Sequence, residues 1–269
     1  MRIQSLRLQN FKRFTDLKIE GIPDTAKLVL LIGANGSGKS SVFDALHLFS
    51  RIARDDSSYH RTDAKAPYDL DISLADGGQL HRGSRGWNAG QIEGTPFFGR
   101  SSLRVVPEVS QIGNPDKLID EDRDRPVRFT HEDRRFNADL ARFTSRIDKA
   151  LREPTFEGKA VDTVAIFREH IQPFNDALKR VFGEDEQTIV QIRNYDNADP
   201  QKAIQLYFKK GSSIIPFNLL SHGEKQIVIL LMGFAVRREQ MENSIVFIDE
   251  MDLHLNTALQ KTVLQEIVE

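Results

Sequence analysis

The chain has 269 residues, 39% hydrophobic and 28% charged, with a formal net charge of −2, a composition typical of a globular protein that gives no support for nonspecific nucleic-acid binding. It contains no cysteine, which excludes disulfide scaffolds and thiolate metal sites, and no apolar run approaches the ~20 residues that cross a membrane. We therefore expect a cytoplasmic protein that makes no contact with a membrane.

Two short segments near the N-terminus, residues 2–10 and 17–20, alternate between apolar and polar side chains. This alternation predicts strands with one solvent-facing side. Residues 28–32 form a continuous apolar run, as expected of a strand that is covered on both faces. A glycine-rich turn follows, and apolar residues at helical spacing predict a helix over residues 41–50.

The next part of the chain, residues 59–99, is polar and rich in glycine. Alternation predicts a strand over residues 70–74, with a hairpin partner that starts at Leu80 after a turn at residues 76–78. A further short strand is predicted over residues 103–106.

Apolar side chains recur every three or four residues in two stretches, residues 136–151 and 164–181. This spacing predicts two helices. Because Pro154 and Gly158 lie between them, we expect a helical hairpin inserted in the sheet domain, with the aromatic side chains of both helices used for packing.

The last third of the chain is predicted to form three strands in succession and then a helix, a strand and a helix. With the elements above, we expect an α/β fold with a mixed sheet and helices. The run at residues 245–248 is apolar throughout and predicts a strand covered on both faces. Strands are predicted over residues 189–192, 203–208, 214–217 and 245–248, and helices over residues 221–238 and 257–268.

Residues 33–40 match the phosphate-loop spacing G-x-x-x-x-G-K-[ST], between a predicted strand and a predicted helix. Glycines let backbone N–H groups turn inward around phosphate oxygens, and the helix N-terminus adds partial positive charge. We expect Lys39 to reach the β- and γ-phosphates of ATP and Ser40 to bind Mg²⁺ through its hydroxyl. An incidental glycine-rich turn is the alternative, and the flanking elements argue against it. The predicted nucleotide contacts are Gly33, Ala34, Asn35, Gly36, Ser37, Gly38, Lys39, Ser40 and Ser41.

The apolar strand at residues 245–248 ends in two acidic residues, Asp249 and Glu250. A buried strand can deliver such carboxylates to the edge of a sheet. Strands often end in acids, but the phosphate loop gives this pair a chemical role. We expect Asp249 to bind Mg²⁺ through water and Glu250 to act as general base on the attacking water, with Lys39 as the second catalytic residue.

Residues 220–226, Leu-Ser-His-Gly-Glu-Lys-Gln, come directly before a predicted helix. Ser221 and Glu224 have the spacing of a capping box, which alone would explain both residues. The position of the segment, just upstream of the acidic strand, favours another interpretation. It resembles the ABC signature motif in the L-S-x-G-E form of the RecF, SMC and OLD (overcoming-lysogenisation-defect) group of ATPases.

Two further segments carry the same resemblance. Residues 8–14 resemble the N-terminal strand motif of that group. Residues 251–256 resemble the histidine-bearing D-loop of OLD-like ATPases, some of which serve in anti-phage defence. The resemblance implies a P-loop NTPase with an ABC-type ATPase core, formed by residues 1–115 and 186–269, and an inserted helical subdomain over residues 116–185.

The resemblance also implies an assembly. Each ATP would lie between the phosphate loop of one subunit and the signature of another, where Ser221 and Gly223 would contact the γ-phosphate. A head-to-tail homodimer follows. The switch histidine of the family lies on a later strand, so the chain, which stops at Glu269, is expected to be a truncated core or the first part of a longer protein.

The sequence departs from the family pattern at several positions. His222 replaces a small residue of the signature, and Asn256 stands where many ABC proteins have the D-loop aspartate. His254 is not expected to be the switch histidine. The Q-loop glutamine is assigned to Gln111, with Gln79 and Gln91 as alternatives.

Three functions fit these observations. The first is a Mg-dependent ATPase whose ATP-driven dimerisation serves DNA repair or anti-phage defence, with DNA or an effector subunit as further candidate partners. The second is a dimeric clamp that hydrolyses little ATP. The third, a nucleotide-binding subunit of a transporter, is least favoured, because residues 10–14 and the L-S-x-G-E segment differ from the transporter pattern.

Overall fold

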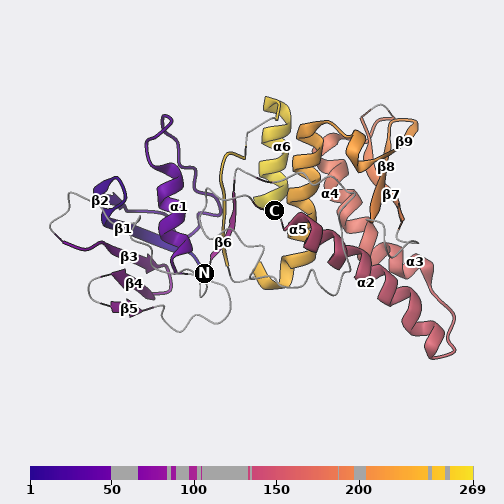
Figure 1. Cartoon of the computed structure of the whole chain (residues 1–269), viewed down its shortest axis with the longest axis horizontal. Coiled ribbons are helices and arrows are strands. Elements are labelled where there is room, and N and C mark those ends of the chain that lie inside the picture. The colour runs from indigo at the N-terminus through magenta and orange to yellow at the C-terminus, as the bar shows by residue number, and fades with distance from the viewer. Residues whose placement is uncertain are drawn as a thin grey trace. The chain divides into compact units, whose positions relative to one another are not determined.

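The computed structural model of the chain divides into two units (Figure 1). The first unit comprises Met1–Leu103, Pro126–His131 and Glu239–Asp249, and the second comprises Arg104–Arg125, Glu132–Arg238 and Glu250–Glu269. The structure describes residues 1–49, 66–83, 86–88, 97–101, 104, 133, 135–186, 188–196, 204–241, 244–251 and 255–268.

The first unit contains an antiparallel sheet with strand order β2-β1-β3-β4-β5. The alternation seen in the sequence is confirmed, since Leu6 and Leu8 of β1 and Leu70 and Ile72 of β3 are buried on the core side. The predicted hairpin joins β3 to β4, with Gly77 in the left-handed conformation at φ 84°. The strands are β1 Ile3–Phe11, β2 Phe14–Ile19, β3 Asp69–Leu74, β4 Gln79–Gly83 and β5 Gly86–Asn88.

A second sheet of the first unit pairs β6 (Phe97–Arg100) with β10 (Ile245–Ile248) in parallel. The sequence predicted β10 but not β6, whose surroundings are polar and rich in glycine. Helix α1 (Lys39–His47) contacts both β1 and β6. The strand predicted over residues 103–106 lies outside the described residues except for Arg104.

The strand predicted over residues 28–32 is wrong. These residues have no regular secondary structure, and Leu28, Val29, Leu30 and Ile32 are exposed, Ile32 to 91%. Leu31 alone packs against the core of the first unit. An apolar run forms a strand only where a neighbouring strand offers its backbone, and none of the described strands pairs with residues 28–32.

The second unit holds the remaining helices and a three-stranded antiparallel sheet in the order β7-β8-β9 (Figure 1). The two helices predicted between residues 136 and 181 are confirmed, and the second is one helical segment that contains a π-helical turn. The elements are α2 Phe136–Phe156, α3 Thr163–Ile166, η4 Phe167–Ile171, α4 Gln172–Phe182, β7 Val190–Asp196, β8 Gln205–Lys210, β9 Ser213–Pro216, η5 Phe217–Leu219, α5 His222–Met241 and α6 Thr257–Val268.

Aromatic side chains of α2 and α4 pack in the core of the second unit, as the sequence predicted. Phe136 of α2 stacks on Phe217 with ring centroids 5.0 Å apart, and Phe143 of α2 meets Phe174 of α4 at 5.8 Å. A buried asparagine, Asn175, adds specificity to this packing. Its side chain accepts a hydrogen bond from the Ile192 N–H at 2.8 Å and donates one to the Ile192 carbonyl at 3.3 Å, which fixes α4 against β7.

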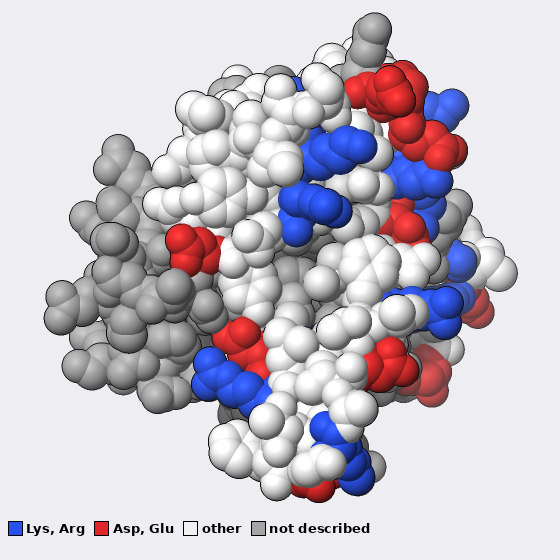
Figure 2. All heavy atoms as spheres, turned by 90° about the vertical axis from the view of Figure 1, so that its right-hand side faces the viewer, with Lys and Arg blue, Asp and Glu red and all other residues white. Residues whose placement is uncertain are grey.

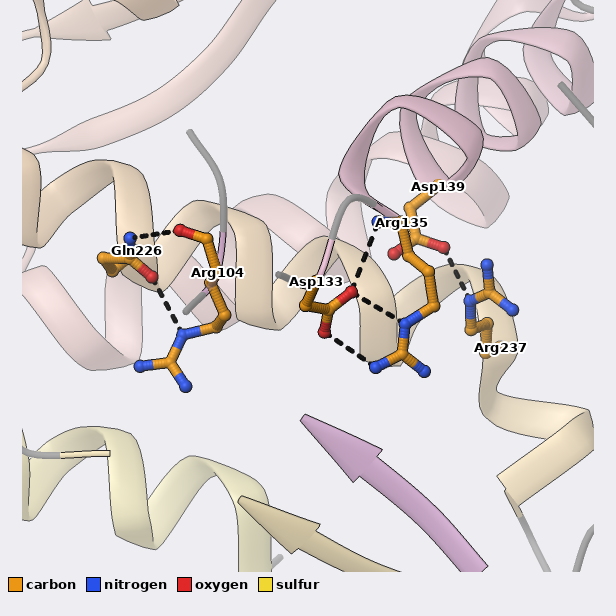
Figure 3. Close-up of polar contacts among 6 residues, drawn as sticks. All are labelled: Arg104, Asp133, Arg135, Asp139, Gln226 and Arg237. Carbon is orange, nitrogen blue, oxygen red and sulfur yellow. Dashed lines mark hydrogen bonds and ion pairs between the residues drawn. The ribbon is translucent and has the colours of Figure 1, made fainter. Parts of the chain in front are cut away.

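Two buried ion pairs lie in the second unit (Figure 3). Arg237 of α5 donates to Asp139 of α2 at 2.6 Å, with both side chains at most 1% exposed. Arg135 donates two hydrogen bonds to Asp133, at 2.8 and 2.7 Å. Removing one partner of such a pair leaves a buried charge uncompensated, and the pair of Arg237 with Asp139 joins α5 to α2.

The surface of the described residues gives two further observations. None of the helices in the described ranges has both the length and the apolarity needed to cross a membrane. On the face that Figure 2 shows, Lys and Arg side chains are interspersed with Asp and Glu. This mixture gives the described part of that face no field of a single sign.

Candidate nucleotide-binding site

The predicted phosphate loop lies in the first unit and leads directly into α1, which begins at Lys39. Gly36 and Gly38 have φ angles of 75° and 103°, a left-handed region that glycine enters without steric cost. The loop is closed by a hydrogen bond of 3.0 Å from the Ser37 N–H to the Ala34 carbonyl. The glycines are therefore required by the backbone path of this turn.

Lys39 folds back over the loop. Its Nζ donates to the carbonyl oxygens of Gly33 at 2.6 Å and Ala34 at 3.2 Å. The ammonium group is thus held at the loop and next to the N-terminus of α1, where a helix favours anions.

Ser40 meets Asp249 across the first unit, although 209 positions separate them in the sequence. The Ser40 hydroxyl donates to Asp249 Oδ2 at 3.0 Å. An aromatic stack aligns the two elements: Phe43, one turn after Ser40, lies parallel to Phe247 with ring centroids 5.5 Å apart. Asp249 directly follows β10 and its N–H continues the pairing with β6, so Asp249 and Phe247, two residues apart, project to the same face.

Asp249 and Glu250 differ in their surroundings. Asp249 is 5% exposed, and its N–H donates to the Arg100 carbonyl at 3.0 Å, which continues the pairing of β10 with β6. Glu250 belongs to the second of the two units. Its side chain is exposed, and its φ is 44°. A residue with a Cβ pays an energetic cost in this left-handed region, so surrounding contacts must hold it there.

Arg13 and Phe14 also lie at the loop, and the sequence did not mark them as site residues. A Cβ placed on Gly38 would come within 2.5 Å of Phe14 Cζ and 2.8 Å of Arg13 Cδ. The preceding residue, Lys12, forms an ion pair with the buried Asp44 of α1, which fixes the turn between β1 and β2. The motif at residues 8–14, noted in the sequence, was the available signal.

The predicted signature segment lies in the second unit. The capping box is confirmed: the Ser221 N–H donates to Glu224 Oε2 at 2.8 Å, and the Glu224 N–H donates to Ser221 Oγ at 3.4 Å. Gly223 follows within the first turn of α5. Burial raises the pKa of Glu224, but hydrogen bonds from Lys210 and Ser221 outweigh burial and leave that pKa below its ordinary value.

A family model described as "AAA domain, putative AbiEii toxin, Type IV TA system" matches residues 28–269. The chain belongs to this AAA domain family. A comparison with curated proteins finds none that matches.

Solved structures resemble this AAA domain over nearly its whole length. The Smc head domain of Pyrococcus furiosus, solved with the C-terminal domain of ScpA, has a TM-score of 0.50 at 15% identity, over 99% of this chain and 86% of that chain. The SMC head domain of Thermotoga maritima has a TM-score of 0.47 at 17% identity, over 100% of this chain and 86% of that chain. The recombination mediator protein RecF has a TM-score of 0.42 at 13% identity, over 97% of this chain and 89% of that chain. The likeness to the first confirms the predicted fold class, the mixed α/β fold found in SMC head domains.

The remaining residues named from the sequence are placed as follows. Asn256 precedes α6 and accepts a hydrogen bond from the Leu259 N–H at 2.9 Å, so it caps that helix. Gln79 is exposed on β4 and accepts from Ser73 at 3.1 Å. Gln91, Gln111 and His254 lie outside the described residues of the AAA domain.

The close packing of Gly38 predicts a measurable loss of stability on substitution. We expect Gly38→Ala to destabilise the AAA domain by more than the roughly 1–2 kcal/mol of left-handed strain, because the methyl group would also displace Phe14. Gly77→Ala is the matched control, since its φ is 84° and no described atom lies within 4 Å of its added Cβ. Urea unfolding measures both, and equal losses would contradict the packing of Phe14 and Arg13 on the loop.

Proposed function

We propose that this AAA domain binds ATP with Mg²⁺ at residues 33–41 and hydrolyses it. The proposal rests on one observation, the hydrogen bond of 3.0 Å between Ser40 and Asp249. It brings together the hydroxyl at the end of the phosphate loop and the carboxylate at the end of β10. These are the two positions from which P-loop ATPases hold a magnesium ion.

The donor set fits magnesium. Mg²⁺ prefers oxygen ligands, and it commonly takes one or two protein oxygens together with phosphate oxygens and water. Ser40 and Asp249 would supply the protein oxygens. When bound, the ion neutralises charge on the phosphates.

The other residues of the loop act on the nucleotide. Lys39 would exchange its bonds to the Gly33 and Ala34 carbonyls for bonds to phosphate oxygens, which are stronger because both partners are charged. Glu250, exposed at the end of the acidic strand, would orient a water molecule and accept its proton. This assignment makes Lys39 and Glu250 the catalytic residues.

The assembly is part of the same proposal. Ser221 and Gly223 stand at the N-terminus of α5, a helix of 20 residues whose first N–H groups favour an anion. We assign them to the γ-phosphate of a nucleotide bound by another subunit, in a head-to-tail homodimer. Residues 1–115 and 186–269 would form the ATPase core and residues 116–185 the inserted subdomain.

The cellular role is assigned to anti-phage defence, with DNA repair as the alternative. The description of the family names a toxin of a Type IV TA system, which supports the defence role. DNA and an effector subunit remain the candidate partners. Steady-state turnover separates an ATPase from a clamp that closes on ATP but hydrolyses little.

The binding assignment is tested at Lys39. We expect Lys39→Ala to weaken ATP binding roughly 10- to 100-fold, since a hydrogen bond to a charged group contributes about 1.5–3 kcal/mol. The fold should survive, because the Lys39 side chain bonds to the carbonyls of Gly33 and Ala34 in its own loop and does not tie that loop to another element through these bonds. Titration with a fluorescent ATP analogue measures the affinity. Lys18→Ala, at an exposed lysine of β2, is the control, and equal affinities in the two variants would refute the assignment.

A further inference from the structure

Arg104 is buried between α5, the helix that begins within the predicted signature segment, and the main chain of Glu250. Its side chain is 7% exposed. Its Nε donates to Gln226 Oε1 on α5 at 2.8 Å (Figure 3), and its Nη2 donates to the carbonyl oxygen of Glu250 at 3.3 Å. One guanidinium group therefore contacts two parts of the chain that the proposed mechanism uses, α5 and Glu250, and no local sequence pattern marks Arg104 for such a role.

The contact with α5 is defined in both directions. The Gln226 amide donates from Nε2 to the Arg104 carbonyl at 3.2 Å. A guanidinium can only donate and a carbonyl can only accept, so these two bonds fix which end of the amide carries oxygen. The same Nε2 lies 3.4 Å from His222 Nε2, one turn earlier on α5. Arg104 is thereby connected, through Gln226, to the first turn of α5.

The backbone of Arg104 is held in place by pairing with a neighbouring segment. It forms an isolated parallel bridge with Asp133. The Asp133 carboxylate is in turn fixed by two bonds from Arg135, and both side chains are at most 3% exposed. A group supported in this way is pre-organised, so it transmits a displacement of one partner to the other.

Glu250 needs such support. Its φ of 44° is costly for a residue with a Cβ, and Arg104 bonds to the carbonyl of this same residue. If Arg104 moves, the peptide plane that follows Glu250 turns, and the direction of the Glu250 side chain changes with it. The placement of a general base is sensitive to displacements of this kind.

We propose that Arg104 is a positioning residue that couples the N-terminal turn of α5 to Glu250. The inference rests on the proposed function, in which Glu250 is the base and the start of α5 meets a nucleotide. A nucleotide that engages the first turn of α5 shifts His222 and Gln226, and Arg104 carries this shift to Glu250. The base is then aligned only when the signature is occupied.

The test replaces Arg104 by lysine. Lysine keeps the positive charge but lacks the planar fork, so it cannot serve Gln226 and the Glu250 carbonyl in the same geometry. We expect kcat to fall at least about tenfold, while KM and the Kd of a fluorescent ATP analogue stay within about twofold, because a misplaced base affects the chemical step and leaves nucleotide binding unchanged.

Arg237→Lys is the matched control. Arg237 is also a buried arginine and lies on α5, the helix that Arg104 contacts, but its side chain donates to Asp139 of α2. We expect Arg237→Lys to lower the unfolding midpoint and to leave kcat unchanged in the folded protein. If both variants lower kcat in proportion to their loss of stability, the role of Arg104 is structural and the inference is overturned.

A second variant keeps the inference testable if Arg104→Lys does not fold. Gln226→Leu removes the connection from the side of α5, and we expect the same loss of kcat with unchanged KM. Combined with Arg104→Lys, it should cause no further loss, whereas additive losses would overturn the coupling.

A wild-type chain without turnover refutes the proposed ATPase function. A wild-type chain that hydrolyses ATP as fast as Arg104→Lys refutes only the inference.

Discussion

Replacement of Glu250 by glutamine is expected to abolish ATP turnover while ATP binding persists. Glutamine keeps the size of the side chain but cannot accept a proton from water. General-base catalysis contributes about 10²- to 10⁴-fold to a rate, so kcat should fall by at least that factor. Asp249 and Ser40 would still hold Mg²⁺, since their contact does not involve the Glu250 side chain. A coupled phosphate-release assay measures kcat, and analogue titration measures binding.

The same variant reports on assembly. If hydrolysis resolves an ATP-bound dimer, Glu250→Gln should accumulate that dimer, and light scattering with and without Mg-ATP would detect the doubled mass. Glu20→Gln, at an exposed carboxylate after β2, is the control. A Glu250→Gln chain that hydrolyses ATP at the wild-type rate would remove Glu250 from the role of base.

Replacement of Ser221 by arginine is expected to abolish ATP-dependent dimerisation and hydrolysis together. In the structure Ser221 caps α5 through Glu224. Loss of a cap costs about 1 kcal/mol, which is too little to unfold the chain or to disturb the phosphate loop. In a shared site the arginine side chain would block the approach of the partner's γ-phosphate. ATP binding to the monomer should therefore remain. Titration with a fluorescent ATP analogue measures this binding, and light scattering measures ATP-dependent dimerisation separately.

A mixing experiment sharpens this prediction. A Ser221→Arg chain and a Lys39→Ala chain can form at most one intact composite site, from the loop of the first and the signature of the second. We expect some ATP-dependent heterodimer in the mixture and none in either chain alone. Full hydrolysis by Ser221→Arg, without dependence on protein concentration, would leave Ser221 as a helix cap and refute the shared site.

The elements of this AAA domain were largely predictable from local sequence. Alternation in residues 2–10 predicted β1, and the three- and four-residue spacing in residues 136–151 predicted α2. In both cases one side of the element is buried against the core, so the period of the apolar residues reports the backbone geometry. The capping box of Ser221 and Glu224 was predictable for the same reason, because its contacts lie within one turn.

The apolar run at residues 28–32 shows where this reasoning fails. Its composition predicted a buried strand, but these residues are irregular and most are exposed. Hydrophobicity describes what a segment could bury, whereas a strand also needs a partner for its backbone hydrogen bonds. None of the described strands pairs with residues 28–32, whereas β10 pairs with β6, a strand that the local pattern did not predict.

The sequence by itself determined the phosphate-loop motif, the acidic pair and the capping box of Ser221 and Glu224, because each is a run of nearby residues whose backbone geometry is set locally. Only the tertiary structure decided which of them meet. Ser40 reaches Asp249 because Phe43 stacks on Phe247, and Arg13 and Phe14 reach Gly38 because Lys12 pairs with Asp44. Arg104 contacts Gln226 across 122 positions and Glu250 across 146. Contacts at such separations depend on packing between elements, and no local pattern encodes them.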